Sequence, residues 1–219
     1  MKRILFLLLL STVSFGETRE FALGHGEFDL VSTSGNIKIT GVSGSKLKVN
    51  FEKIKWNKDC EIVFKKKDNK VKVEVKEDSS WFSSNECQIN FSVSMPKNLE
   101  SDLKLGSGNI ELSEVNGEID FKLGSGKVSV LNTSSASIEG DVGSGSIEIK
   151  YSTLLSGSDF ESNTGAGNIS ILIPKSKTAK VKFKSGTGQL KNTVIQSDTA
   201  DLKVDVKTGT GSLEIDYVK

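Results

Sequence analysis

The sequence predicts an all-β protein, a parallel β-helix (β-solenoid) with an antiparallel β unit near its N-terminus. Three observations predict this fold. A Gly-x-Gly phrase followed by alternating apolar residues recurs along the chain. Apolar and polar residues alternate with a period of two almost everywhere, and beyond the first residues no long stretch has the 3.6-residue period of a helix. A turn and strand repeated at a near-constant period is typical of stacked coils.

Residues 1–16 have the pattern of a secretory signal peptide. Lys2 and Arg3 precede the apolar run 4–10, and small and polar residues lead to Gly16. The run is too short to span a membrane, so we expect no transmembrane segment in the mature chain. An uncleaved anchor is the alternative. The expected location is extracytoplasmic: the periplasm, the cell surface or the medium.

The charge balance predicts no binding to nucleic acid. Removing Lys2 and Arg3 with the signal leaves 27 basic and 28 acidic residues, a net charge of −1. Nucleic-acid binding depends on an excess of Lys and Arg that neutralises phosphates. The expected partners are therefore an envelope protein or a glycan.

Residues 17–100 hold a first repeat, over 28–39, and then an antiparallel β unit. Asp68 and Asn69 separate two alternating runs, 62–64 and 71–75, in the manner of a polar hairpin turn. A further run ends at Pro96, where a strand should stop. Since the ends of stacked coils must be covered, we expect residues 46–100 to cover one end of the solenoid.

Cys60 and Cys87 predict one disulfide, because two cysteines in an oxidising compartment usually pair. Each cysteine lies on the apolar face of an alternating segment, so the two thiols could meet inside one sheet. Two buried free thiols are the alternative. No metal site and no cofactor are predicted, because two cysteines with only His25 nearby do not fill a tetrahedral shell.

Residues 101–219 form the repeat array, in which one glycine of each phrase marks a corner. Successive corners are separated by 18 to 23 residues, which leaves room for a second strand ahead of each corner. Glycine supplies a positive φ and lacks the Cβ that would strike the next coil. Six coil steps of roughly 4.8 Å predict a rod on the order of 29 Å long. With the first repeat included, the corner set is Gly35, Gly108, Gly126, Gly145, Gly167, Gly188 and Gly211.

The alternation predicts which side chains face inward. The first apolar residue after each corner should form one inward ladder: Ile110, Val128, Ile147, Ile169, Leu190 and Leu213. The pattern breaks at Asn192, which indicates an irregular coil there. The six-residue apolar-Gly period usual for left-handed solenoids is not evident, which favours a right-handed one.

The order of these segments resembles a known family. The strand ending at Pro96, the phrase 103–112 and the run 115–119 are similar to the bacterial putative-adhesin family of β-strand repeats of unknown function, and to the related head GIN auto-transporter adhesin domain. The resemblance covers roughly residues 20–219. It implies an extracytoplasmic domain like a parallel β-helix, and it carries over no catalytic residue.

The sequence offers little support for a catalytic site. A phosphate-binding Gly-x-Gly needs a following helix, whereas strands follow here. Calcium-binding nonapeptides need an Asp where this repeat has an apolar residue, although an adventitious calcium site at Asp141 or Asp159 stays open. Ser–His chemistry would have only His25 as its base. A carbohydrate-active enzyme could use aligned glutamates, although a solvated strand face is the much better explanation of them: Glu111, Glu148 and Glu214.

Two groups of side chains could form contacts with a partner. Trp56, Trp81 and Phe82 could form an aromatic binding patch, although a plug at the end of the solenoid or of the hairpin sheet is the favoured explanation. Residues 65–67 are three lysines that could touch anionic polymers or could keep an edge strand soluble.

The functional hypothesis is a non-enzymatic extracytoplasmic module of the adhesin type that makes cell-surface or envelope interactions, with self-association through its stackable ends. One alternative is a carbohydrate-active enzyme on the same scaffold. Another is an envelope-stress sensing module that signals through a partner.

Overall fold

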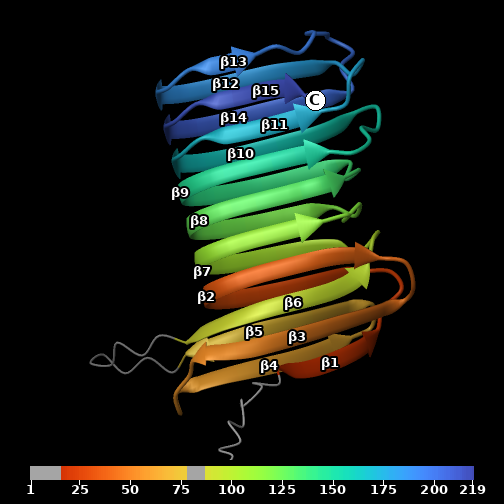
Figure 1. Ribbon diagram of the computed structural model, residues 1–219, viewed down its shortest axis with the longest axis vertical. Coiled ribbons are helices and arrows are strands. Elements are labelled where there is room, and N and C mark those ends of the chain that lie inside the picture. The colour runs from red at the N-terminus through yellow and green to blue at the C-terminus, as the bar shows by residue number, and fades with distance from the viewer. Residues whose placement is uncertain (1–15, 78–86) are drawn as a thin grey trace, which may run out of the picture.

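The computed structural model describes residues 16–77 and 87–219, and in these ranges every regular element is a strand. The strands lie as rungs along the long axis of the molecule (Figure 1). No helix long and apolar enough to cross a membrane occurs in the described residues. The strands are β1 (Glu17–Ala22), β2 (Glu27–Val42), β3 (Lys46–Lys55), β4 (Cys60–Lys67), β5 (Lys70–Glu77), β6 (Gln88–Pro96), β7 (Glu100–Ser113), β8 (Ile119–Thr133), β9 (Ser137–Tyr151), β10 (Ser158–Ala166), β11 (Ile169–Ile173), β12 (Ala179–Thr187), β13 (Leu190–Asn192), β14 (Leu202–Thr210) and β15 (Leu213–Tyr217).

Each central coil is one long strand that bends at its Gly-x-Gly phrase. β7, β8 and β9 pair in parallel and in register both before and after the bend. Leu103 faces Phe121 before the bend, and Leu112 faces Val130 after it. The buried side chains from both halves belong to one hydrophobic cluster. The apolar alternation therefore fills a common core between the two halves of every coil.

The bend requires glycine at its second position. Gly126 has a φ of 135°, and a Cβ placed there would lie 1.7 Å from the carbonyl oxygen of Gly108 in the coil below. No side chain fits at that distance, because the backbone of the neighbouring coil cannot give way as a flexible side chain could. The repeated glycine is thus a consequence of stacking one corner on another.

The coils do not stack in chain order. β14 pairs with β10 on one side and with β12 on the other, and β15 likewise lies between β11 and β13. Figure 1 shows β12 and β13 at the end of the stack, beyond the last strands of the chain. Leu190 stands in the predicted ladder, opposite Leu213, but it is 44% exposed, because no described rung lies beyond its outermost coil. Leu213, in the inserted coil, is fully buried.

The other end of the stack combines parallel and antiparallel pairs. β5 and β6 lie in parallel on the two halves of β2 and so continue the stack. β4 pairs antiparallel with β5, β3 with β6, and β1 with β3. The antiparallel unit predicted for residues 46–100 is therefore only partly antiparallel. The predicted turn at Asp68 joins β4 to β5, where Lys67 faces Lys70.

Candidate functional site

A shallow groove runs along the outside of the corner, across the rungs. Its floor is the first glycine of each phrase, and these glycines also stack: a Cβ on Gly124 would lie 2.3 Å from the carbonyl oxygen of Gly106. Since this column carries no side chains, the surface is hollow there. Two open depressions of about 680 and 510 Å³ lie along it, and Asn163 lines both.

One wall of the groove is a column of long polar side chains, one from each coil. In ladder order the column is Lys104, Lys122, Asp141, Asn163, Lys207 and Lys184. Lys104 pairs with Asp102 at 2.8 Å, and Lys122 lies 3.6 Å from Asp141. Within residues 16–77 and 87–219, no carboxylate lies within ion-pair distance of Lys184 or Lys207. The groove therefore carries cations at both ends and neutral or acidic groups in its middle.

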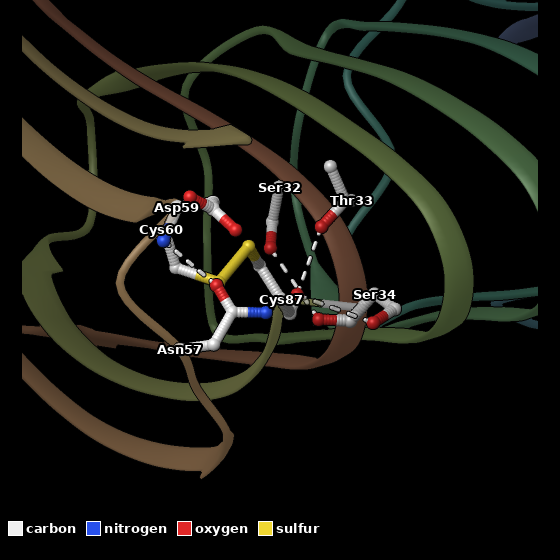
Figure 2. Close-up of a disulfide and its surroundings, with 7 residues drawn as sticks. All are labelled: Ser32, Thr33, Ser34, Asn57, Asp59, Cys60 and Cys87. Carbon is white, nitrogen blue, oxygen red and sulfur yellow. Dashed lines mark hydrogen bonds between the residues drawn. A yellow bond between two sulfur atoms is a disulfide. The ribbon is translucent and has the colours of Figure 1, made fainter. Parts of the chain in front are cut away.

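The groove ends at Thr33, whose backbone lies beneath Gly106 in the coil below. Figure 2 shows that this residue lies beside the disulfide. Cys60 and Cys87 are bonded, with their Cα atoms 5.8 Å apart, as the sequence predicts. The hydroxyls of Thr33 and Ser34 donate to the carbonyl oxygen of Cys87 at 2.8 and 3.3 Å. The disulfide thus ties the start of β4 to the residue before β6, which is hydrogen-bonded to the corner of β2, where Thr33-Ser34-Gly35 stands in place of a Gly-x-Gly phrase.

The aromatic patch is described only in part. Trp56 is half-buried and packs against the core, with the Lys53 ammonium 5.1 Å from its ring centroid. Trp81 and Phe82 lie outside the described residues, so the patch stays a prediction. A phenylalanine cluster that sequence reasoning missed links β1, β3, β4 and β6. Its centroid distances are 5.6 to 6.3 Å, and its members are Phe21, Phe51, Phe64 and Phe91.

The aligned glutamates do not form an acid–base pair. They occupy every second rung of one ladder, with Ser129 and Ser170 between them. Each glutamate is neutralised by a lysine: Lys38 with Glu111 at 3.0 Å, Lys127 with Glu148 at 2.6 Å and Lys191 with Glu214 at 2.5 Å.

The remaining predicted residues are held by local contacts. The ring of His25 lies 2.8 Å from the amide of Asn69. Asp141 accepts a hydrogen bond from Asn163, and Asp159 accepts one from Ser137. Lys66, in the run 65–67, donates to the carbonyl oxygen of Ala22, on the neighbouring β1. The structure does not bring these residues together.

The structure does gather an acidic cluster that the sequence did not reveal. Oxygens of Glu27, Asp29 and Asp102 lie within 4.8 Å of one another, and the Lys70 ammonium lies 2.9 Å from both Glu27 and Asp29. Burial raises the pKa of Asp29, Lys70 opposes that rise and Glu27 adds to it. The cluster depends on the stacking of β7 on β2, and no local sequence pattern predicts that stacking.

Comparison with known proteins identifies relatives of the fold. The model of the family described as Toastrack DUF4097 matches residues 52–219. A putative cell adhesion protein from Clostridium sporogenes is 16% identical, with 93% of this chain and 100% of that chain covered and a TM-score of 0.52. A putative adhesin from Bacteroides fragilis is 14% identical over 92% of this chain and 96% of that chain, with a TM-score of 0.44. No curated protein matches the sequence.

Proposed function

The chain belongs to the Toastrack DUF4097 family, and from that membership we propose that it is a non-enzymatic, adhesion-like binding module that acts outside the cytoplasm. The observation that carries the proposal is the glycine-floored groove along the corner. Its occupant is an extended acidic polysaccharide of a cell surface or envelope. The domain division proposed with it is a leader over 1–16, a first repeat with a covering unit over 17–100, and a repeat array over 101–219.

The shape of the groove suits a linear polymer. It crosses the rungs, so equivalent groups recur along it about every 4.8 Å. Its floor is backbone, which a flat chain can approach closely. The middle residue of most Gly-x-Gly phrases follows the floor glycine directly and has an exposed hydroxyl, for example Ser125 and Ser144, which can hydrogen-bond to a sugar.

The lysines at the two ends of the groove favour an acidic polymer over a neutral one. Lys184 and Lys207 stand on adjacent rungs, as do Lys104 and Lys122 at the other end. Exposed ammonium groups attract carboxylates in a salt-dependent manner. The name of the structurally similar Clostridium sporogenes protein, a putative cell adhesion protein, is consistent with a surface role. The disulfide and the signal-like segment 1–16 favour an oxidising compartment.

Binding of the purified protein to immobilised polygalacturonate, an acidic polysaccharide, and to dextran, a neutral one, tests the proposal. Saturable binding to polygalacturonate that weakens with salt is expected, with dextran bound weakly or not at all. The double variant Lys122→Ala/Lys207→Ala should lose most of this binding. Lys65→Ala/Lys67→Ala removes the same charge away from the groove and should retain it.

Two results would contradict the proposal. Equal losses in both double variants would show that the polymer is held by net charge and not by the groove. Shortening of the polymer during incubation, seen by size-exclusion chromatography, would contradict the non-enzymatic assignment. The location is checked separately by fractionating cells that express the full chain.

A further inference from the structure

The acidic cluster is built from two rungs that are distant in the chain. Asp29 on β2 and Asp102 on β7 are direct partners in the parallel ladder. Glu27 precedes Asp29 by two positions and so shares its outer face. Oxygens of the three carboxylates lie within 4.8 Å of one another. Like charges at this separation repel unless cations stand among them.

One oxygen of the cluster is buried without a partner. The Asp29 side chain is only 9% exposed, and its Oδ2 forms an ion pair with the Lys70 ammonium, 2.9 Å from Nζ. Its Oδ1 is buried and finds no hydrogen-bond donor among the described residues. Buried carboxylate oxygens are almost always satisfied by a donor or a cation. The carboxylate that carries this unpaired oxygen belongs to the three-carboxylate cluster, so a cation held by the cluster could satisfy both of its oxygens where the Lys70 ammonium satisfies one.

The surrounding ladder adds negative charge that the lysines do not balance. Asp120 and Glu139 continue the column on the next two rungs, and neither has an ion-pair partner within the described part of the chain. Lys104 is bonded to Asp102, and Lys72 lies 3.7 Å from Glu74. Among the described residues, the Lys70 ammonium is the one cation that forms ion pairs with Glu27 and Asp29.

We propose that Glu27, Asp29 and Asp102 bind a divalent cation of the calcium type, in place of the Lys70 ammonium. Calcium takes oxygen ligands at about 2.3–2.6 Å, so ligands on opposite sides of the ion lie about 4.8 Å apart, within the spread of this cluster. Magnesium demands near-ideal octahedral geometry and gives up its water reluctantly, so it is expected to bind three protein carboxylates less readily. Lys70 is 47% exposed, so its side chain can swing into solvent and vacate the position. Water completes the shell.

The cation would join β2 to β7 where Lys70 now joins β2 to β5. This site is separate from the proposed polymer groove, and the inference does not depend on it. Calorimetric titration of the purified protein with CaCl₂ and MgCl₂ at constant ionic strength tests it. We expect saturable calcium binding with a dissociation constant on the order of 0.1–1 mM, the range of extracellular calcium modules, and weaker magnesium binding.

Variants locate the site. Asp29→Asn and Asp102→Asn should each weaken calcium binding about tenfold or more. Glu148→Gln, on β9 and after the bend of its coil, should leave calcium binding unchanged. Lys70→Met should tighten binding severalfold, because it removes the competing ammonium. Lys207→Met makes the same charge change on β14, several rungs from the cluster, and should have little effect. Far-UV circular dichroism checks that each variant folds.

Three results would overturn the proposal. The first is the absence of saturable heat up to about 10 mM calcium, ten times the weakest affinity expected. The second is calcium binding that survives in both Asp29→Asn and Asp102→Asn. The third is a Lys70→Met variant that binds calcium no more tightly than Lys207→Met does. The last comparison remains decisive if loss of the buried Asp29 carboxylate prevents folding.

Discussion

Gly211 lies against Gly167, and Gly188, which precedes it in the chain, lies on its opposite side. A Cβ on Gly211 would come 1.8 Å from the carbonyl oxygen of Gly167, and a Cβ on Gly188 would come 1.8 Å from that of Gly211. The final coil is therefore an interior rung. The coil that it displaces to the edge carries Lys180, Lys182 and Lys184 on β12, and charged side chains protect an open edge from pairing with other chains.

Leu190 and Leu213 occupy the same place after the corner, yet they differ in burial because of this insertion. Leu213→Ala should lower the free energy of unfolding by about 2–5 kcal/mol, the usual loss for a buried leucine. Leu190→Ala should lower it by less than about 1 kcal/mol, since the side chain already meets solvent. Urea denaturation measures both. Similar losses would contradict the order of the coils described above.

The corner glycines allow steric and conformational effects to be separated. Gly126 and Gly44 have similar φ values, 135° and 124°, but nothing lies within 4 Å of a Cβ on Gly44. Gly44→Ala should therefore cost only the backbone strain, about 1–2 kcal/mol. Gly126→Ala must also push apart two stacked coils, and we expect a loss greater by about 2 kcal/mol or a failure to fold. The measurement is urea denaturation, and equal losses would show that the stacking contact is unimportant.

Local patterns of the sequence predict the rungs and corners well. The period-two alternation locates β8 and β14, and Gly108 and Gly126 mark corners because every coil repeats the same physical constraint. The pairing of Cys60 with Cys87 follows from their shared apolar faces in an oxidising context. These features depend on residues close in the chain or on a repeated motif.

The ladder of the central coils follows from the repeat, but the order of the last rungs and the neighbours of β2 were not predictable, because they are global properties of the fold. Nothing near Leu190 distinguishes an edge coil from an interior one. The meeting of Asp29 with Asp102 likewise depends on which coil lies on β2. The groove needed the stacked corners as well, since a column of glycines such as Gly106 and Gly124 becomes a surface feature only after the coils are aligned.

The disulfide should stabilise the folded chain mainly by restricting the unfolded one. It closes a loop between residues separated by 27 positions, for which the chain-entropy model gives about 3.5 kcal/mol. The double variant Cys60→Ser/Cys87→Ser should therefore lose about 2–4 kcal/mol in urea denaturation. Dithiothreitol should lower the stability of the parent protein and leave the double variant unchanged. A parent protein unaffected by complete reduction, verified by thiol titration, would contradict this role.

The hydrogen bonds of the Asp201 carboxylate should make the free energy of unfolding depend on pH. Its carboxylate accepts hydrogen bonds from the Lys177 ammonium at 3.0 Å and from the backbone N–H and hydroxyl of Thr178 at 3.1 and 3.2 Å. Lys177 first, and then Thr178, hold the pKa of Asp201 below its ordinary value. Because the folded pKa is lower than the unfolded one, the charged carboxylate favours folding above the unfolded pKa of about 3.9. That contribution is lost as the pH falls through the folded pKa.

Asp201→Asn should therefore destabilise the protein by about 1 kcal/mol near pH 7, a value reduced for partial exposure to solvent. The difference from the parent protein should shrink when both are measured below about pH 3, where the parent carboxyl also becomes protonated. Lys177→Met should reproduce part of the pH dependence, because it removes the main cause of the lowered pKa. Asp198→Asn is the matched control: Asp198 is 94% exposed and, among the described residues, is bonded to Lys180 alone, so its replacement should have a smaller effect on urea denaturation. A deficit for Asp201→Asn that stayed constant between these pH values would assign the effect to lost packing and not to the charge of Asp201.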